Sequence, residues 1–456
     1  MKKISLLLAV SLIVAGAAGA KVMLPQATRF QLDNGLSVVV VERHTLPLFS
    51  IGVIFRAGSI YDEPSREGLA YLCNDLPLRG TATRSAKEIT DQVSFGGGQL
   101  QNYCDREDAG FVGEFMSAYG ESCFEILGDV ILHGAFPEDE FEKARQQAQA
   151  YLAGVLEDPR AAADDFIFSQ ILGGTPYAHS PLGTPAGLDS VTRDEALSFF
   201  KRYYTPDNCL IVVCGDVTSD IVRGWLTKYL GQWQGKADRK SISRNLQPAK
   251  GPTILLLNKE DATQAQIRLG GLCPAKGNPD YVPFEAAKTV FGGSFTSRLT
   301  NEIRINRGLS YTARCEASHF SAGGVVYVNT FTKYETVSEA IDVILAESRR
   351  MQTEPVPDSE LAGAIKYQSG LYPLDFETND DIVSVFVSMW LYDLEASSFE
   401  DFQEKLKTVG PRQVMDQARK YFPSRDFHLV VVGRADSIET RLRKYGQVTV
   451  KDLIAP

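Results

Sequence analysis

GSIYDEPSREGLAYLCNDLPLRGT, Gly58 to Thr81, is the segment that says most about the fold and function of this chain. Its apolar residues recur at helical spacing and predict a buried helix face: Leu69, Leu72, Cys73 and Leu76. Tyr71, Asn74 and Asp75 stand at positions i, i+3 and i+4, which places them together on another face. The helix therefore presents a phenol, a carboxamide and a carboxylate side by side.

Outside this helix, the chain contains two similar halves. FFKRYYTPDNCLIVVCGDV predicts an apolar strand that ends at Gly215, and ARKYFPSRDFHLVVVGRAD predicts one that ends at Gly433, 218 residues later. Pro137 and Pro357 each precede an acidic helix start, at an offset of 220 residues. Two unrelated landmarks with nearly the same period favour an internal duplication over a chance likeness between two α/β halves.

The N-terminus predicts a secretory leader. Lys2 and Lys3 precede an apolar run over residues 4–15 and the small residues of Ala18-Gly19-Ala20, so we expect cleavage after Ala20. The run is shorter than the roughly 20 residues that span a bilayer. No Cys follows the small residues, which argues against lipid anchoring. We therefore predict a soluble periplasmic protein without a membrane anchor.

Composition excludes some function classes. The chain has 57 acidic and 47 basic residues, a net charge of -10, and no Lys/Arg run interleaved with aromatic residues, so nucleic acid is not an expected partner. Its seven cysteines lack C-x-x-C spacing, and an odd count leaves at least one thiol free. Cys209 and Cys214 would point to opposite faces of a regular strand, which prevents a bond between them.

Residues 58–81 resemble the zinc-binding helix of the pitrilysin/insulinase family of peptidases. That family carries an inverted H-x-x-E-H motif, preceded by G-S-x-x-[DE] and G-L-A and followed by G-T. Here Tyr71 and Asp75 take the two His positions, and Asn74 takes the position of the Glu base. Tyr151, six residues after Arg145, stands where the family has its third ligand, a Glu. The alternative is an ordinary amphipathic helix that is unrelated to this family.

The resemblance implies a degenerate zinc site at Tyr71, Asn74, Asp75 and Tyr151. Phenols and a carboxamide are poor zinc ligands, and one carboxylate cannot replace three protein ligands. An Asn amide also cannot take a proton from water near neutral pH. We therefore expect this chain to bind no cofactor, while its five isolated histidines leave a different metal arrangement as a less favoured alternative: His44, His133, His179, His319 and His428.

The second half contains VFGGSFTSRLTNEIRINRGLSYTARCE, which resembles the family's other signature. Arg304 and Tyr311 have the spacing of the Arg/Tyr pair that the family places against bound peptide and the developing oxyanion. A guanidinium offers a fixed fork of donors, and a phenol can donate to an oxyanion. The resemblance thus assigns catalytic roles to Arg304 and Tyr311. The alternative is a surface ion pair for Arg304 and sheet packing for Tyr311.

A glycine-rich stretch follows in FGGGQLQNY, residues 95–103. In the family this turn leads to an edge strand that accepts substrate as an added strand, a mode that suits peptides of varied sequence. The corresponding substrate-binding residues are Gly97, Gly98, Gln99, Gln101 and Asn102. A flexible turn between a helix and a hairpin is the alternative, and the sequence does not separate the two.

Together, these features predict an α+β protein of two homologous domains, residues 21–235 and 251–456, joined by a polar linker over residues 236–250. Each domain should contain an antiparallel-dominated sheet with helices packed on one face. The resemblance implies one half of a clam-shell heterodimer, whose partner keeps an intact H-x-x-E-H motif and holds the zinc. This chain would supply Arg304 and Tyr311 to peptide substrates. The alternative is a pseudo-peptidase that binds peptides or acts as a scaffold.

Overall fold

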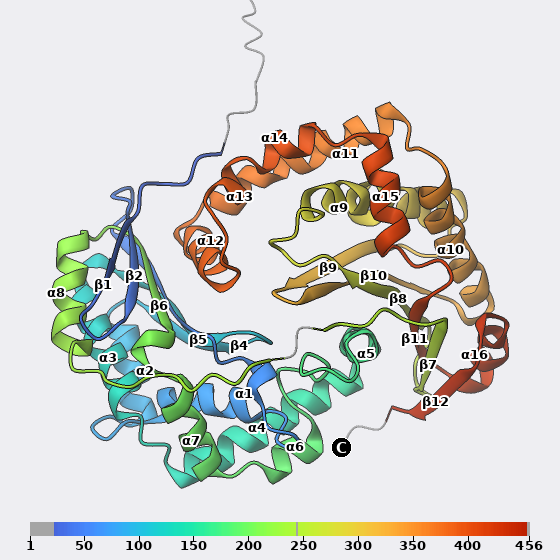
Figure 1. Cartoon of the computed structure of the whole chain (residues 1–456). Coiled ribbons are helices and arrows are strands. Elements are labelled where there is room, and N and C mark those ends of the chain that lie inside the picture. Colours follow the sequence, from blue (N-terminus) through green and yellow to red (C-terminus); the bar gives the residue numbers. More distant parts are fainter. Residues whose placement is uncertain (1–21, 243–244, 454–456) are drawn as a thin grey trace, which may run out of the picture.

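The computed structural model describes residues 22–242 and 245–453, so the predicted signal peptide lies outside the described residues. Two six-stranded sheets organise the chain (Figure 1). The first has the order β1 (Thr28–Gln31), β2 (Ser37–Glu42), β6 (Cys209–Gly215), β3 (Leu48–Phe55), β5 (Ala109–Met116) and β4 (Gln99–Cys104). The second has the order β12 (Val448–Asp452), β7 (Pro252–Asn258), β11 (Phe427–Gly433), β8 (Ala265–Cys273), β10 (Gly323–Thr332) and β9 (Ala313–Phe320).

Both sheets are mixed with a majority of antiparallel pairs, which confirms the predicted fold class. In the first sheet only β2 and β6 run parallel, and in the second β7 runs parallel to both β11 and β12. The duplication is visible in the element order. β6 ends at Gly215 and β11 at Gly433, while Pro137 and Pro357 cap equivalent helices.

The helices of each half cover one face of their own sheet. In the first half these are α1 (Leu69–Asp75), α2 (Ala86–Phe95), α3 (Gly120–His133), α4 (Glu138–Glu157), α7 (Arg193–Tyr203) and α8 (Ser219–Leu230). In the second half they are α9 (Tyr281–Lys288), α10 (Val337–Thr353), α11 (Asp358–Leu371), α14 (Phe402–Lys407), α15 (Pro411–Tyr421) and α16 (Ala435–Leu442). Among the described residues, no helix combines the length and apolarity that crossing a bilayer requires.

The opposite face of each sheet receives a helix from the other half, a feature that the sequence did not predict. α5 (Pro159–Ile171) packs on the second sheet, and α12 (Asn379–Leu391) packs on the first (Figure 1). Alternate side chains along a strand point to opposite faces of the sheet, so each strand contributes to a core on both faces. Val38 and Val40 face the first half's own helices, whereas Val39 and Val41 face α12. Cys209 and Cys214 point into these two opposite cores, and all seven cysteines are free thiols.

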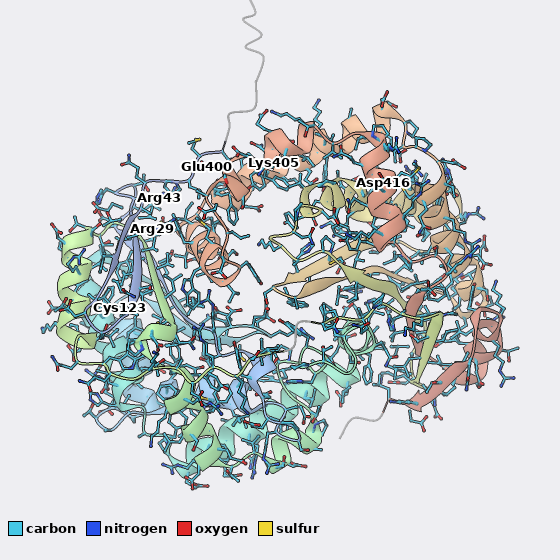
Figure 2. All side chains as sticks on the ribbon, in the orientation of Figure 1. Arg29, Arg43, Cys123, Glu400, Lys405 and Asp416 are labelled. Carbon is cyan, nitrogen blue, oxygen red and sulfur yellow. The ribbon has the colours of Figure 1, made fainter. Side chains whose placement is uncertain are left out.

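Polar contacts reinforce this exchange. The Glu107 carboxylate accepts hydrogen bonds from the Ser321 backbone N–H at 3.0 and 3.1 Å and from the Tyr177 hydroxyl at 2.7 Å. Arg29 and Arg43 extend from the first half toward α12 (Figure 2), where the Arg29 guanidinium lies 5.5 Å from the centre of the Phe386 ring. The Arg43 guanidinium donates to the Glu377 carbonyl oxygen. The two halves are therefore joined by buried apolar surface as well as by the linker.

Candidate functional site

The helix α1 begins at a tight turn built by the quoted motif. Gly68 has φ of +104°, and a Cβ there would meet Leu188 Cδ2 at 2.6 Å, so glycine is required. The backbone N–H groups of Gly68 and Ala70 donate to the two oxygens of Asp62, at 2.8 and 2.7 Å. Burial raises the pKa of this carboxyl group, and His179 lies 3.1 Å from it. The turn thus fixes the start of α1 and the direction of its side chains.

Asn74, at the position of the family's Glu base, is a fully buried structural residue with 0% exposure. Its Nδ2 donates to the carbonyl oxygens of Tyr103 at 2.7 Å and Gly110 at 3.2 Å. Its Oδ1 accepts from the Tyr204 hydroxyl at 2.8 Å. The amide therefore ties α1 to β4, β5 and the end of α7.

Tyr71, Asp75 and Tyr151 are brought together, as the alignment of the degenerate site requires. Burial raises the pKa of Tyr71 to about 12, and the neighbouring Asp75 and Tyr151 add to this shift. Asp75 accepts from Arg79 Nε and, at 3.2 Å, from Asn102 Nδ2. Burial also raises the pKa of Asp75, although Arg79 opposes this effect. The carboxylate is thus already paired.

The same region contains no constellation suited to a metal. In the part of the chain that the structure describes, no group of three or more His, Cys, Asp or Glu side chains could hold a metal ion. Tyr151 lies on α4 with 59% of its surface exposed. Tyr71 and Tyr151 therefore present phenols where a zinc site would need imidazole and carboxylate ligands.

The glycine-rich stretch leads directly into β4, which is the edge strand of the first sheet. Gly97 has φ of +62°, and a Cβ on Gly98 would meet the Phe115 ring at 2.4 Å, so both glycines are needed for the turn. The Gln99 and Gln101 side chains are exposed, whereas Asn102 faces Asp75. The free edge of β4 therefore carries unpaired backbone groups beside the degenerate site.

Arg304 and Tyr311 lie together on the surface of the second half. Arg304 comes from the π-helical segment Thr300–Asn306, and Tyr311 lies two residues before β9, the edge strand of the second sheet. The Arg304 guanidinium lies 4.0 Å from the centre of the Tyr311 ring and 4.9 Å from that of Phe295. Tyr311 and Phe295 are 72% and 63% exposed. Arg304 thus stacks on two exposed rings and forms no ion pair within the described residues.

These residues line a cavity of about 650 Å³, in which Phe295 is a member that the sequence prediction missed. Phe295 follows Gly292-Gly293 by two residues in the quoted motif, and this position could have indicated that it belongs to the site. Glu285 and Lys288, one helical turn apart on α9, line the same cavity and form an ion pair of 2.7 Å. Burial would raise the pKa of Glu285, but Lys288 and His319 outweigh it and lower this pKa to about 2.

Comparison with known proteins decides the family. A profile described as insulinase (peptidase family M16) matches residues 37–185, and one described as the peptidase M16 inactive domain matches residues 190–367. The chain belongs to peptidase family M16. The sequence resemblance is thereby confirmed, and the two matches together cover most of residues 37–367, which include parts of both halves of the chain.

Curated M16 relatives include uncharacterized zinc proteases. One from Bacillus subtilis is 23% identical over 407 residues, covering 89% of this chain and 97% of the relative. One from Mycobacterium leprae is 27% identical over 326 residues, covering 70% of this chain and 72% of the relative. These relatives are named zinc proteases, whereas this chain has two phenols, a carboxamide and a carboxylate at the positions aligned with the zinc ligands and the base: Tyr71, Asn74, Asp75 and Tyr151.

Solved structures share the M16 fold. A peptidase M16 inactive domain from Pseudomonas fluorescens superposes with a TM-score of 0.82 at 22% identity, covering 90% of this chain and 98% of that one. A protease from Helicobacter pylori gives a TM-score of 0.82 at 20% identity, covering 90% and 100%. A chain of complex III2 from Candida albicans gives 0.76 at 16% identity, covering 92% and 100%. The fold of this chain is therefore shared by solved structures that include a peptidase M16 inactive domain.

Proposed function

We propose that this chain is the non-catalytic subunit of a heterodimeric periplasmic zinc metallopeptidase. Its Arg304 and Tyr311 would contact a peptide that is bound at a zinc site on the partner subunit. One observation carries the proposal. The Arg/Tyr pair is exposed on a cavity in the second half, whereas the four positions for zinc and base hold Tyr71, Asn74, Asp75 and Tyr151.

The chemistry of the pair fits a role in peptide cleavage. The Tyr311 hydroxyl can donate to the oxyanion that develops when water attacks a peptide carbonyl. The Arg304 guanidinium keeps free donors for a peptide carbonyl while its face rests on Tyr311 and Phe295. The rings hold the fork in one orientation, which reduces the entropy lost when peptide binds. Zinc on the partner would polarise the carbonyl and activate the water.

The first half supports the loss of independent catalysis. Because both Nδ2 hydrogens of Asn74 are committed to backbone carbonyls, this side chain has no donor left for a water molecule. Asp75 is paired with Arg79 and Asn102. The β4 edge beside them, including Gly97, Gly98, Gln99, Gln101 and Asn102, is the proposed contact for an extended peptide.

A partner chain follows from the same reasoning. A complete M16 chamber needs a metal site that this chain does not supply, and one of its structural neighbours is a chain of an assembly, complex III2. The expected partner is a secreted M16 chain of similar length with an intact H-x-x-E-H motif. A neighbouring reading frame that encodes such a chain would identify it.

The test is reconstitution with that partner, followed by measurement of peptide cleavage. Tyr311→Phe removes one hydroxyl and should lower kcat by roughly 10²–10³-fold with little change in KM. Arg304→Ala should raise KM and lower kcat, and Arg304→Lys should rescue only in part because a point charge cannot reproduce the planar fork. Tyr367→Phe is the matched control, since Tyr367 lines the same cavity from α11 without stacking on Arg304.

Size-exclusion chromatography should show that all variants still form the heterodimer. If the combined Tyr311→Phe and Arg304→Ala variant cleaves peptides at the parental rate, the chain acts only as a scaffold or peptide-binding pseudo-peptidase.

A further inference from the structure

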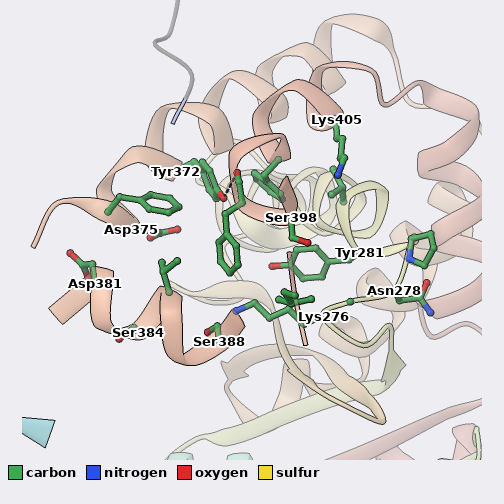
Figure 3. A pocket seen from close by; sticks show the side chains of 18 residues that line it. Lys276, Asn278, Tyr281, Tyr372, Asp375, Asp381, Ser384, Ser388, Ser398 and Lys405 are labelled. Carbon is green, nitrogen blue, oxygen red and sulfur yellow. Dashed lines mark hydrogen bonds between the residues drawn. The ribbon is translucent and has the colours of Figure 1, made fainter. Parts of the chain in front are cut away.

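A second large cavity lies away from every residue discussed so far as a candidate site. It has a volume of about 660 Å³ and is lined by the turn at residues 276–279, by α9, α12 and α14, and by the segments Tyr372–Phe376 and Ser397–Glu400 (Figure 3). This volume falls within the range of cavities that bind small molecules.

Aromatic rings form much of its wall: Tyr281, Tyr372, Phe376, Phe399 and Phe402. The rings of Tyr372 and Phe402 stack with centroids 4.5 Å apart, and the Tyr372 and Phe376 rings meet edge to face at 5.1 Å. The Tyr372 hydroxyl donates to the Phe399 carbonyl oxygen at 2.8 Å, which fixes this wall. A preformed aromatic wall of this kind favours a flat apolar group.

Lys276 adds a cation to the cavity. Figure 3 shows its side chain extending along the floor toward Ser388, below the Tyr281 hydroxyl. The ammonium lies 5.7 Å from the centre of the Tyr392 ring, and no carboxylate of the described residues forms an ion pair with it. Glu285 is already paired with Lys288 and His319, and Asp375 extends from a different part of the wall.

This arrangement leaves the Lys276 ammonium largely out of solvent and without an ion pair among the described residues, although the carboxylates of Asp375 and Asp381 also line the cavity. Burial lowers the pKa of Lys276, with Glu285 and Asp375 opposing the shift only in part. A partly desolvated ammonium gains most from an anion that reaches it inside the cavity. Two hydroxyl groups without a hydrogen-bond partner among the described residues also line the cavity, Ser388 from α12 and Ser398 from the segment Ser397–Glu400.

We propose that this cavity binds a small carboxylate attached to an aromatic group, with the carboxylate on Lys276 and the ring against Tyr372 and Phe402. Free aromatic amino acids and the C-terminal residue of a peptide both carry this chemistry. The Lys276 ammonium with neighbouring hydroxyls suits a carboxylate, and the second lysine that lines the cavity, Lys405, is exposed. Phosphate sites usually gather several cations or backbone N–H groups.

The proposed site is distinct from the one that contains Arg304 and Tyr311. Tyr281 and Val282 of α9 face this cavity, whereas Glu285 and Lys288 of the same helix face the other. Binding here requires neither zinc nor a partner chain. The inference can therefore fail while the proposed function holds, and the reverse is also true.

The test is isothermal titration calorimetry on the isolated full-length mature chain with four probes: phenylalanine, phenylalaninamide, Gly-Gly-Phe and Gly-Gly-Phe amide. We expect saturable binding of at least one free carboxylate and binding at least about tenfold weaker for its amide, since a charge-assisted contact is lost. Binding of phenylalanine alone identifies a free amino acid as the ligand. Binding of the tripeptide identifies a peptide C-terminus.

Two variants tie the binding to this cavity. Lys276→Met keeps the length of the side chain and should abolish the preference for the carboxylate, whereas Lys366→Met, at an exposed lysine of α11 outside the cavity, should not. Ser398→Phe should fill the space and prevent binding while circular dichroism shows a folded chain. The inference is overturned if neither carboxylate binds at millimolar concentration, if amides bind equally well, or if Lys276→Met keeps the parental affinity.

Discussion

Asn74→Asp should make the stability of this protein depend on pH in a way that the parent does not. The parent amide is fully buried and makes three hydrogen bonds, two as donor to the carbonyl oxygens of Tyr103 and Gly110 and one as acceptor from Tyr204. Aspartate has almost the same shape. When protonated it retains one donor for the carbonyls, and when ionised it retains none and faces them with a negative charge.

The direction of the pH effect follows from these carbonyls. Burial and the carbonyl dipoles disfavour the charged form, so the pKa of the introduced carboxyl group in the folded variant should rise above the unfolded value of about 3.9. The folded state then binds more protons than the unfolded state above that pH, and its stability falls as pH rises. Each unit of pKa elevation costs about 1.4 kcal/mol at high pH, so an elevation of about 3 units adds roughly 4 kcal/mol.

The assay is urea unfolding of parent and variant at pH 4.5 and pH 8, followed by the fluorescence of Trp225 and Trp233 in the first half and Trp390 of α12, which packs on the first sheet. The difference in free energy of unfolding between parent and variant should be about 1–2 kcal/mol at the lower pH, the cost of one lost buried hydrogen bond. It should grow by several kcal/mol at the higher pH. Asn74→Ala is the control, because its larger loss should not vary with pH.

An equal loss at both pH values for Asn74→Asp would refute the reasoning, because it would mean that the side chain reaches water or lacks these carbonyl partners. The Asn74→Ala control would then show whether the Asn74 side chain contributes to the free energy of unfolding.

Three further results are expected. The purified chain should contain no stoichiometric zinc and show no peptidase activity, and one chelator-removable zinc per chain that is needed for cleavage would contradict this. The combined change Tyr71→His, Asn74→Glu, Asp75→His and Tyr151→Glu should give measurable zinc binding by calorimetry with weak or no catalysis, at a cost in stability because the glutamate that replaces Asn74 offers no donor to the carbonyls. A folded quadruple variant without added zinc affinity would disprove the alignment. Gly52→Val should destabilise the chain by about 1–3 kcal/mol in thermal unfolding, since a Cβ there meets Val383 of α12 at 2.8 Å, and an unchanged Tm would contradict the packing.

Parts of the candidate site could be predicted from the sequence because they depend on local spacing. The i, i+3, i+4 pattern put Tyr71, Asn74 and Asp75 on one helix, and the motif that contains Arg304 and Tyr311 placed them on neighbouring elements. Their surroundings could not be predicted in this way. Asn74 is bonded to groups 29, 36 and 130 residues away, and such contacts leave no periodic signal in the chain.

Two strand ends were also predictable, because the apolar strands expected to end at Gly215 and Gly433 do end there in the structure. Their complete burial had a cause that the sequence did not reveal. Residues of both parities along β2 and β11 are buried since each sheet is covered on both faces, once by its own helices and once by a helix of the other half.

The sequence by itself determined the duplication at 218–220 residues, the mixed helix and strand pattern, the M16 resemblance and the replacement of the zinc and base residues, because each follows from residue type at a given spacing. Only the tertiary structure decided that α5 and α12 exchange between the sheets, that Phe295 supports Arg304, and that Lys276 meets a wall of aromatic rings. These arrangements join segments that are distant in the chain. They depend on which surfaces pack to exclude water, and that is a property of the whole fold rather than of any local pattern.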